Sequence, residues 1–264
     1  MAVAGLGTRL FVDKWELTGF TQSVDTNIQT ELLDTSTLDN TVTSYVTGLT
    51  TATLAVEGLY DPSLPNWDAV LSDNEFWVTR MQPDTHDIGD IVQVANCILG
   101  KNTQTSGTSE AVRTSMEFQT TADTFRSLKR SWLLYDQTDD MATGSAFAVS
   151  GSSVDLGAPD TAGDPKYEDV RWTIVAHILN QNEDEVGYAA GNNRMLLQHS
   201  LDDSTFATLG TLNFELDDEG RYSGSLVATA DVDINQYVRI TRRAGTPTTG
   251  ANSRMIVSLA IDSN

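Results

Sequence analysis

The residues with the widest chemical repertoire are few in this sequence and lie far apart. The histidines are His86, His177 and His199, and the only thiol is Cys97. A zinc site needs several such ligands at short, regular spacings, and this sequence has no such spacing. The Gly5-Leu-Gly7 segment is too short to cradle a phosphate, and no Gly-x-Ser-x-Gly elbow occurs. The sequence therefore predicts no catalytic, cofactor-binding or metal-ligating residue.

Carboxylates are abundant and form short clusters in expected loops. The clusters are Asp139-Asp140, Glu183-Asp184-Glu185, Asp202-Asp203 and Asp217-Asp218-Glu219. Hard cations such as calcium bind carboxylate oxygens. The segment that starts at Asp231 nevertheless fails as an EF-hand, because Gln236 replaces the required Gly and Arg242 the required Glu. Glycosidases also use two carboxylates, but chance pairs are expected among so many acids. We interpret the clusters as solvated loop charge, and we expect that the protein is not an enzyme.

The isolated reactive residues fit structural roles better than chemical ones. His177 and His199 lie within apolar segments, which favours hydrogen-bonded structural histidines over a catalytic base. Cys97 lies in the apolar run from Ile91 to Leu99, where a buried thiol behaves as a small hydrophobic group. Most of the tryptophans have apolar neighbours, so we expect them in a core and not on a sugar-stacking platform.

Net charge is the most unusual property of the composition. The chain of 264 residues has 37 acidic and 16 basic residues, which gives a formal charge of −21. Aspartate dominates the acids and lysine is rare, so the surface is expected to stay hydrated and soluble in concentrated salt, where screening weakens self-repulsion. The alternative is an ordinary acidic protein. Either way the charge argues against a nucleic-acid-binding surface, although an acidic wall could serve DNA as a non-stick conduit.

The sequence predicts no membrane association and no secretory route. No apolar stretch approaches the roughly 18 residues of a membrane-spanning helix. The segment from Met1 to Gly7 also lacks the charged start and long apolar middle of a signal peptide. We therefore expect a protein that is soluble where it is made.

Alternation of apolar and polar residues with period two dominates the chain and indicates strands. Met116 and Phe118 face one way while Glu117 and Gln119 face the other, and Trp172, Ile174, Ala176 and Ile178 alternate similarly. The expected strands cover residues 8–13, 15–23, 27–33, 41–47, 51–60, 75–81, 90–100, 112–118, 172–178, 193–200, 206–216, 221–230, 236–243 and 255–261. Their spacing predicts a mainly β fold of the β-sandwich or barrel type.

Two segments have helical signals, and one stretch interrupts the strands. Ser63 can cap a short helix that ends at Leu71, and residues 121–134 fit a weak helical pattern or, equally, a strand. Residues 137–169 are rich in turn residues. We therefore expect a β-sandwich domain at 1–136 with a short flanking helix, a linker or start of the second domain at 137–169, and a second β-sandwich domain at 170–264.

The order of several short motifs resembles the major tail (tail tube) proteins of long-tailed bacteriophages and archaeal tailed viruses. In the first half the motifs are Thr8–Asp13, Trp15–Phe20, Glu31–Leu38, Tyr45–Leu49 and Ala52–Asp61. In the second half they are Trp172–Leu179, Leu196–Asp202, Phe206–Leu209 and Tyr237–Ile240. The second group is similar to a His-Ser-x-Asp strand followed by a turn and a Tyr-x-Arg strand in that family.

The resemblance implies a structural subunit of the virion tail that is made in the host cytoplasm. Such subunits close into rings that stack into a hollow tube, and the genome passes through the lumen without specific binding. Hexameric rings are favoured, while two tube-like domains in one chain would allow trimeric rings. The implied partners are further copies and the tail terminator, baseplate and tape-measure proteins. The implied inner wall includes carboxylates of the first domain, which would repel DNA.

The Thr-rich segment from Asp34 to Thr53 is the candidate for an extended hairpin between rings. Its candidate contact residues are Asp34, Thr35, Thr37, Asp39, Thr41, Thr43, Tyr45, Thr47 and Leu49. An ordinary surface hairpin is the alternative for this segment. The alternatives for the whole protein are a capsid decoration or tail completion subunit and, less favoured, a carbohydrate-binding β-sandwich module.

The charge imbalance generates a first testable prediction. The midpoint of thermal unfolding should climb steeply as NaCl is added, because salt screens the repulsion among surface carboxylates. Thermal melts followed by circular dichroism across a series of NaCl concentrations measure this response. A midpoint that stays flat across the series would contradict adaptation to saline conditions.

Overall fold

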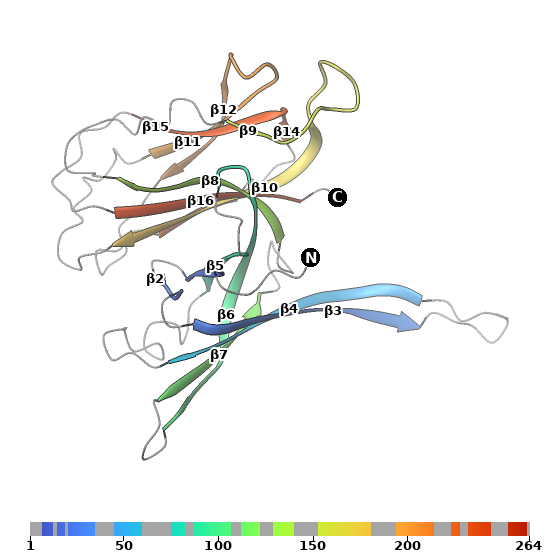
Figure 1. The fold of residues 1–264 in the computed structure, drawn as a ribbon. Helices are drawn as coiled ribbons and strands as arrows, with labels where there is room; N and C mark the ends of the chain where they lie inside the picture. The colour runs from blue at the N-terminus through green and yellow to red at the C-terminus, as the bar shows by residue number, and fades with distance from the viewer. Residues whose placement is uncertain are drawn as a thin grey trace, which may run out of the picture. The chain divides into compact units, whose positions relative to one another are not determined.

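The structure is a computed structural model. It describes residues 7–12, 15–18, 21–34, 45–59, 75–82, 87–106, 112–121, 129–139, 153–180, 194–213, 223–227, 232–243 and 253–262. The regular elements of these residues are all strands, which confirms the mainly β prediction (Figure 1).

The strands follow one another as β1 (Arg9–Val12), β2 (Trp15–Glu16), β3 (Thr21–Asp34), β4 (Tyr45–Leu59), β5 (Phe76–Met81), β6 (Ile91–Thr105), β7 (Arg113–Thr120), β8 (Lys129–Asp139), β9 (Val154–Asp155), β10 (Tyr167–Asn180), β11 (Arg194–Ser200), β12 (Ala207–Asn213), β13 (Ser223–Val227), β14 (Val232–Ile234), β15 (Tyr237–Arg243) and β16 (Ser253–Asp262).

The chain forms two compact units that are not contiguous in sequence. Unit 1 comprises Met1–Glu16, Thr79–Val94 and Lys129–Asn264, and unit 2 comprises Leu17–Val78 and Ala95–Leu128. This division differs from the expected sequential domains at 1–136 and 170–264. Residue 136 lies within strand β8, which pairs antiparallel with the last strand, β16, so distant parts of the chain share one sheet.

Unit 1 contains a β-sandwich. One layer has the antiparallel order β13-β10-β16-β8, and the other has the order β12-β11-β15-β9. Trp172, Ile174 and Leu259 of the first layer share a core with Leu197 and Ile240 of the second. These residues alternate along their strands with residues of the opposite face, as expected for side chains that interdigitate between two sheets.

Strands β10 and β16 are buried on both faces, which accounts for their nearly continuous apolar sequences. Thr173, Val175 and His177 alternate with the sandwich residues of β10 and are also buried. On this second face the His177 ring lies 6.1 Å from the Phe11 ring of β1, and its Nε2 lies 2.7 Å from Thr79 Oγ1 of β5. His177 is therefore a hydrogen-bonded core residue.

An ion-pair network fixes β1 and β2 to β8 within unit 1. Arg9 lies 3.0 Å from Asp136 and 3.0 Å from Glu16. The side chains of Arg9 and Asp136 are only 14% and 6% exposed, so solvent screens this pair weakly. Loss of one partner would leave a poorly solvated charge, which makes the network more consequential than a surface ion pair.

Unit 2 is built on the antiparallel strands β3, β4, β7 and β6, in that order. One face is apolar and includes Leu54 and Val56 of β4 with Met116 and Phe118 of β7, all buried. Phe118 meets Phe76 of β5 edge to face, with ring centroids 5.4 Å apart. The strict alternation of buried and exposed residues along β7 confirms the period-two interpretation of this segment.

Only one of the two segments with helical signals reaches the described residues. The segment 121–134 was left open between helix and strand, and its last part lies in strand β8, where pairing with β16 outweighs the weak helical pattern. The helix expected at Ser63–Leu71 lies outside the described residues. The expected strands at 15–23 and 27–33 are realised as the short β2 and the long β3.

The contact between Thr79 and His177 generates a stability prediction. Thr79→Val keeps the shape of the side chain but removes the buried partner of His177 Nε2, so it should lower the free energy of unfolding by about 1–3 kcal/mol. Urea denaturation followed by tryptophan fluorescence measures the change. The same substitution at the exposed Thr208 of β12 is the control and should cost at most about 0.5 kcal/mol. Equal costs at the two sites would contradict the role of the buried contact.

Candidate assembly surface

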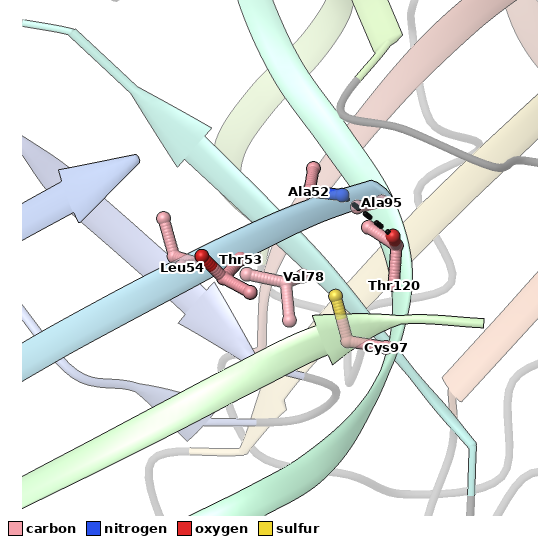
Figure 2. A pocket seen from close by; sticks show the side chains of 7 residues that line it. All are labelled: Ala52, Thr53, Leu54, Val78, Ala95, Cys97 and Thr120. Atoms are coloured by element: carbon pink, nitrogen blue, oxygen red, sulfur yellow. Dashed lines mark hydrogen bonds between the residues drawn. The ribbon is translucent and has the colours of Figure 1, made fainter. Parts of the chain in front are cut away.

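The described residues of unit 2 enclose a small apolar depression that offers no chemistry to a ligand. It is lined by Ala52, Thr53, Leu54, Val78, Ala95, Cys97 and Thr120 (Figure 2). Two threonines, Thr53 and Thr120, line it, and the Thr120 hydroxyl already accepts a hydrogen bond of 3.1 Å from the backbone N–H of Ala52. Burial raises the pKa of the Cys97 thiol to about 12, so the thiolate that would react is strongly disfavoured. The depression is a packing feature of the core.

The histidine and acid clusters do not form a reactive centre within the described residues. His199 accepts a hydrogen bond of 3.3 Å at Nδ1 from the backbone N–H of Asn235. Burial lowers the pKa of His199, and the charge of Asp233 partly opposes this shift. His86 lies outside the described residues, among which no group of His, Cys, Asp or Glu could hold a metal ion. The same part of the chain contains no helix that is long and apolar enough to cross a membrane.

The long hairpin formed by β3 and β4 is the most distinctive surface feature. The two strands pair from Thr21 opposite Gly58 out to Asp34 opposite Tyr45, with irregularities near both ends (Figure 1). β4 is flanked on its other side by β7 only from Thr53 to Leu59. In the described structure, the outer half of the hairpin is therefore a two-stranded ribbon, and β3 is an edge strand along its length.

The outer half of the hairpin exposes apolar side chains. Ile28 is 52% exposed and Leu32 is 62% exposed. Ile28 lies opposite Ala52, so it continues the face on which Ala52, Leu54 and Val56 are buried. A solvated ribbon would not need an apolar residue there, since nothing in the described chain covers it. Exposed apolar side chains beside an open strand edge are typical of an interaction surface.

The opposite face of the unit 2 sheet is polar. Paired residues of neighbouring strands point the same way, so the register sets the composition of this face. Its residues are Ser23, Asp25, Asn27, Thr53, Ala55, Glu57, Leu59, Ile98, Lys101, Thr103, Thr105, Arg113, Ser115, Glu117 and Gln119. Three acids and two bases give this face a formal charge of −1, so per residue its net charge is close to that of the whole chain.

The motif residues of the second half are used to build unit 1. Asp202 accepts hydrogen bonds from the backbone N–H groups of Thr205 and Ser204, at 2.9 and 3.0 Å, and from the Ser200 hydroxyl at 2.9 Å. These bonds, led by the one from Thr205, lower the pKa of Asp202 well below its usual range. The His-Ser-x-Asp segment is thus a folded turn that ends β11.

The predicted inter-ring residues lie partly on the hairpin that the structure describes. Asp34 ends β3, and Tyr45, Thr47 and Leu49 lie on β4, with Asp34 opposite Tyr45 and Leu32 opposite Thr47. Thr35, Thr37, Asp39, Thr41 and Thr43 lie outside the described residues. Sequence reasoning missed Ile28 and Leu32. For Ile28 the available signal was a single large apolar residue between the polar Asn27 and Gln29, whereas Leu32 lies beside Leu33 and gives no such signal.

Comparisons with known proteins find similarity only at the level of solved structures. No family model and no curated protein matches the sequence. A chain in the tail of an empty gene transfer agent particle with C6 symmetry has 11% identity and a TM-score of 0.38, over 47% of this chain and 98% of the other.

Two further solved structures match nearly the whole chain. The Dit protein of phage SPP1, described as a paradigm of the hub adsorption apparatus in phages that infect Gram-positive bacteria, has 11% identity and a TM-score of 0.30, over 97% of this chain and 99% of the other. A chain of the phage p2 baseplate in its activated conformation has 11% identity and a TM-score of 0.34, over 97% and 98%. The similar structures are thus tail and baseplate components, and TM-scores below 0.5 carry no argument about the function of this chain.

The exposed apolar residues of the hairpin generate a prediction about the isolated subunit. The double substitution Ile28→Ser and Leu32→Ser should change the free energy of unfolding by less than about 1 kcal/mol, because neither side chain packs in the subunit core. Leu54→Ala, on the buried part of the same hairpin, should cost about 2–5 kcal/mol. Urea denaturation of the three proteins under identical conditions makes the comparison. A large loss in the double variant would assign Ile28 and Leu32 to the core of the monomer.

Proposed function

We propose that this protein is a structural subunit of a virus tail, and that its copies form stacked rings of a tail tube. The single observation that carries the proposal is the β3–β4 hairpin, whose outer half combines an open strand edge with the exposed Ile28 and Leu32. The motif order that resembles tail tube proteins supports the same function. The proposed function does not require a catalytic or ligand-binding pocket.

The open edge of β3 supports lateral assembly. Backbone N–H and C=O groups at an edge can pair with a strand of another chain, which extends the sheet from one subunit to the next. Head-to-tail contacts of this kind close into a ring when the rotation between copies permits. Hexameric rings are our preferred stoichiometry, with trimeric rings as the alternative.

The outer hairpin supports stacking of one ring on the next. A two-stranded ribbon is at best marginally stable by itself in water, so contacts with another copy would stabilise its conformation. Burial of Ile28 and Leu32 in that contact would add roughly 1.5–3 kcal/mol for each side chain that becomes fully covered. The segment from Asp34 to Leu49 is the proposed tip of this contact.

The polar face of unit 2 is the proposed inner wall for the genome. Serine, threonine, asparagine and glutamine side chains alternate there with Asp25, Glu57 and Glu117. Lys101 and Arg113 reduce the repulsion that these carboxylates exert on DNA phosphates, and they are too few to form a basic binding patch. We therefore expect a lumen that repels DNA weakly and has no preference for a particular nucleotide sequence. The other proposed partners are the tail terminator, baseplate and tape-measure proteins.

Electron microscopy of the purified protein at high concentration and in high salt tests the proposal. The unmodified protein should form rings or long tubes. Deletion of Asp34–Leu49 should abolish tubes while circular dichroism still shows a folded subunit. The substitutions Ile28→Ser and Leu32→Ser should weaken assembly at least about tenfold, the effect of losing about 1.4 kcal/mol per contact.

A matched control is Leu201→Ser, which removes a residue of unit 1 that is 46% exposed. This variant should assemble like the unmodified protein. Tubes that form normally after the deletion would overturn the role of the hairpin. Discrete particles without rings or tubes would favour a capsid decoration or tail completion subunit.

A further inference from the structure

The outward face of the β12-β11-β15-β9 sheet in unit 1 carries one arginine in a fixed orientation. Val238 and Ile240 of β15 are buried in the sandwich core, so Arg239 between them faces away from it. Its guanidinium carbon lies 3.6 Å from the centroid of the Phe206 ring, and its Nε donates a hydrogen bond of 3.0 Å to Gln198 Oε1. The stacked ring and the amide together fix the plane of the guanidinium.

Among the described residues, none occupies the terminal nitrogens of Arg239. Within the described part of the chain, the side chain of Arg239 makes no ion pair, and its hydrogen bond to Gln198 uses only Nε. The two terminal amino groups form a planar fork whose donors match the two oxygens of a carboxylate. Since the ring and the amide already hold the side chain, a ligand would have little conformational entropy left to remove.

The neighbours of Arg239 are suited to a polar ligand with a single negative charge. Across the strands Arg239 lies beside Gln198, and Gln198 lies beside Thr208. Tyr237 precedes Arg239 by two positions on the same face, and its hydroxyl has no hydrogen-bond partner in the described residues. The chain carries a formal charge of −21, which disfavours anions of higher charge.

We propose that Arg239, with Phe206 and Gln198 as positioning residues, forms a binding site for a carboxylate group. Arg239 would bind the two carboxylate oxygens through its terminal nitrogens, and Tyr237 would supply a further donor. The carboxylate can belong to a small molecule or to an acidic side chain of a second copy of the chain. This inference is independent of the proposed role in a tail tube, because it uses none of the hairpin residues.

Acetate and its neutral analogue acetamide form a matched pair of probes for this site. Titration of the ¹⁵N-labelled full chain at constant ionic strength should shift the Arg239 Nε–H resonance saturably with acetate and leave it unchanged with acetamide. Arg239→Lys keeps the charge without the fork and should weaken acetate binding by about tenfold, whereas Arg239→Gln should abolish it. Because these substitutions remove the observed resonance, backbone resonances of Gln198 and Phe206 report binding in the variants.

Two controls separate the site from general charge effects and from misfolding. Arg113→Gln removes the same charge from an exposed position in unit 2 and should leave acetate binding unchanged. Thermal melts of each variant establish that it is folded. Sedimentation with and without acetate distinguishes the sources of the carboxylate. Self-association weakened by both acetate and Arg239→Gln assigns the ligand to a second copy, and unaffected self-association assigns it to a separate molecule.

The absence of a saturable shift with acetate would overturn the proposal. Equal responses to acetate and acetamide would overturn it as well, because the charge would then play no part. Tighter binding of inorganic phosphate than of acetate would contradict the assignment to a singly charged ligand. Acetate binding that survives Arg239→Gln would show that another group holds the anion.

Discussion

Strand β4 has neighbours on both sides in one part of unit 2 and on one side in another. This difference decides which residues of the unit are buried and which are exposed. From Thr53 to Leu59 this strand lies between β3 and β7, and its apolar residues are buried. Beyond that point β3 is its only partner among the described residues, and backbone hydrogen bonds across this single pair of strands hold the ribbon. The same strand is thus part of a core at one end and part of an open surface at the other.

This arrangement explains why apolar residues occur where no core exists. Ile28 lies in register with the buried Ala52, but the sheet is too narrow at this level to cover it. Burial of such a residue contributes a favourable free energy only when a second molecule binds and covers it. The buried part of one continuous apolar face therefore stabilises the folded subunit, and the exposed part of the same face is available for contact with a partner.

Local patterns in the sequence predict the strands of this protein well, because each strand has its own alternation. The buried Met116 and Phe118 of β7 follow from the period of two alone. The division into units does not follow, because it depends on the pairing of β8 with β16, which are separated by more than a hundred residues. Residues 129–134 show the same limit, since their conformation is decided by the strand they pair with and not by the weak helical pattern.

A hairpin in this part of the chain is predictable from the sequence, but the exposed apolar residues along it are not. The resemblance to tail tube proteins pointed to threonine and aspartate residues near the tip, whereas the structure adds Ile28 and Leu32 along the ribbon. Total charge suggested a strongly acidic inner wall. On the polar face, which is the proposed inner wall, the register brings Lys101 opposite Glu117, a pairing that only the three-dimensional arrangement can reveal.

The position of Cys97 has a consequence for the durability of any assembly of this chain. It is the only cysteine of the sequence, and it is enclosed in the core of unit 2. Folded copies therefore present no thiol from which a covalent bridge between them could form. Without disulfides, non-covalent contacts between copies would respond by mass action to concentration and salt.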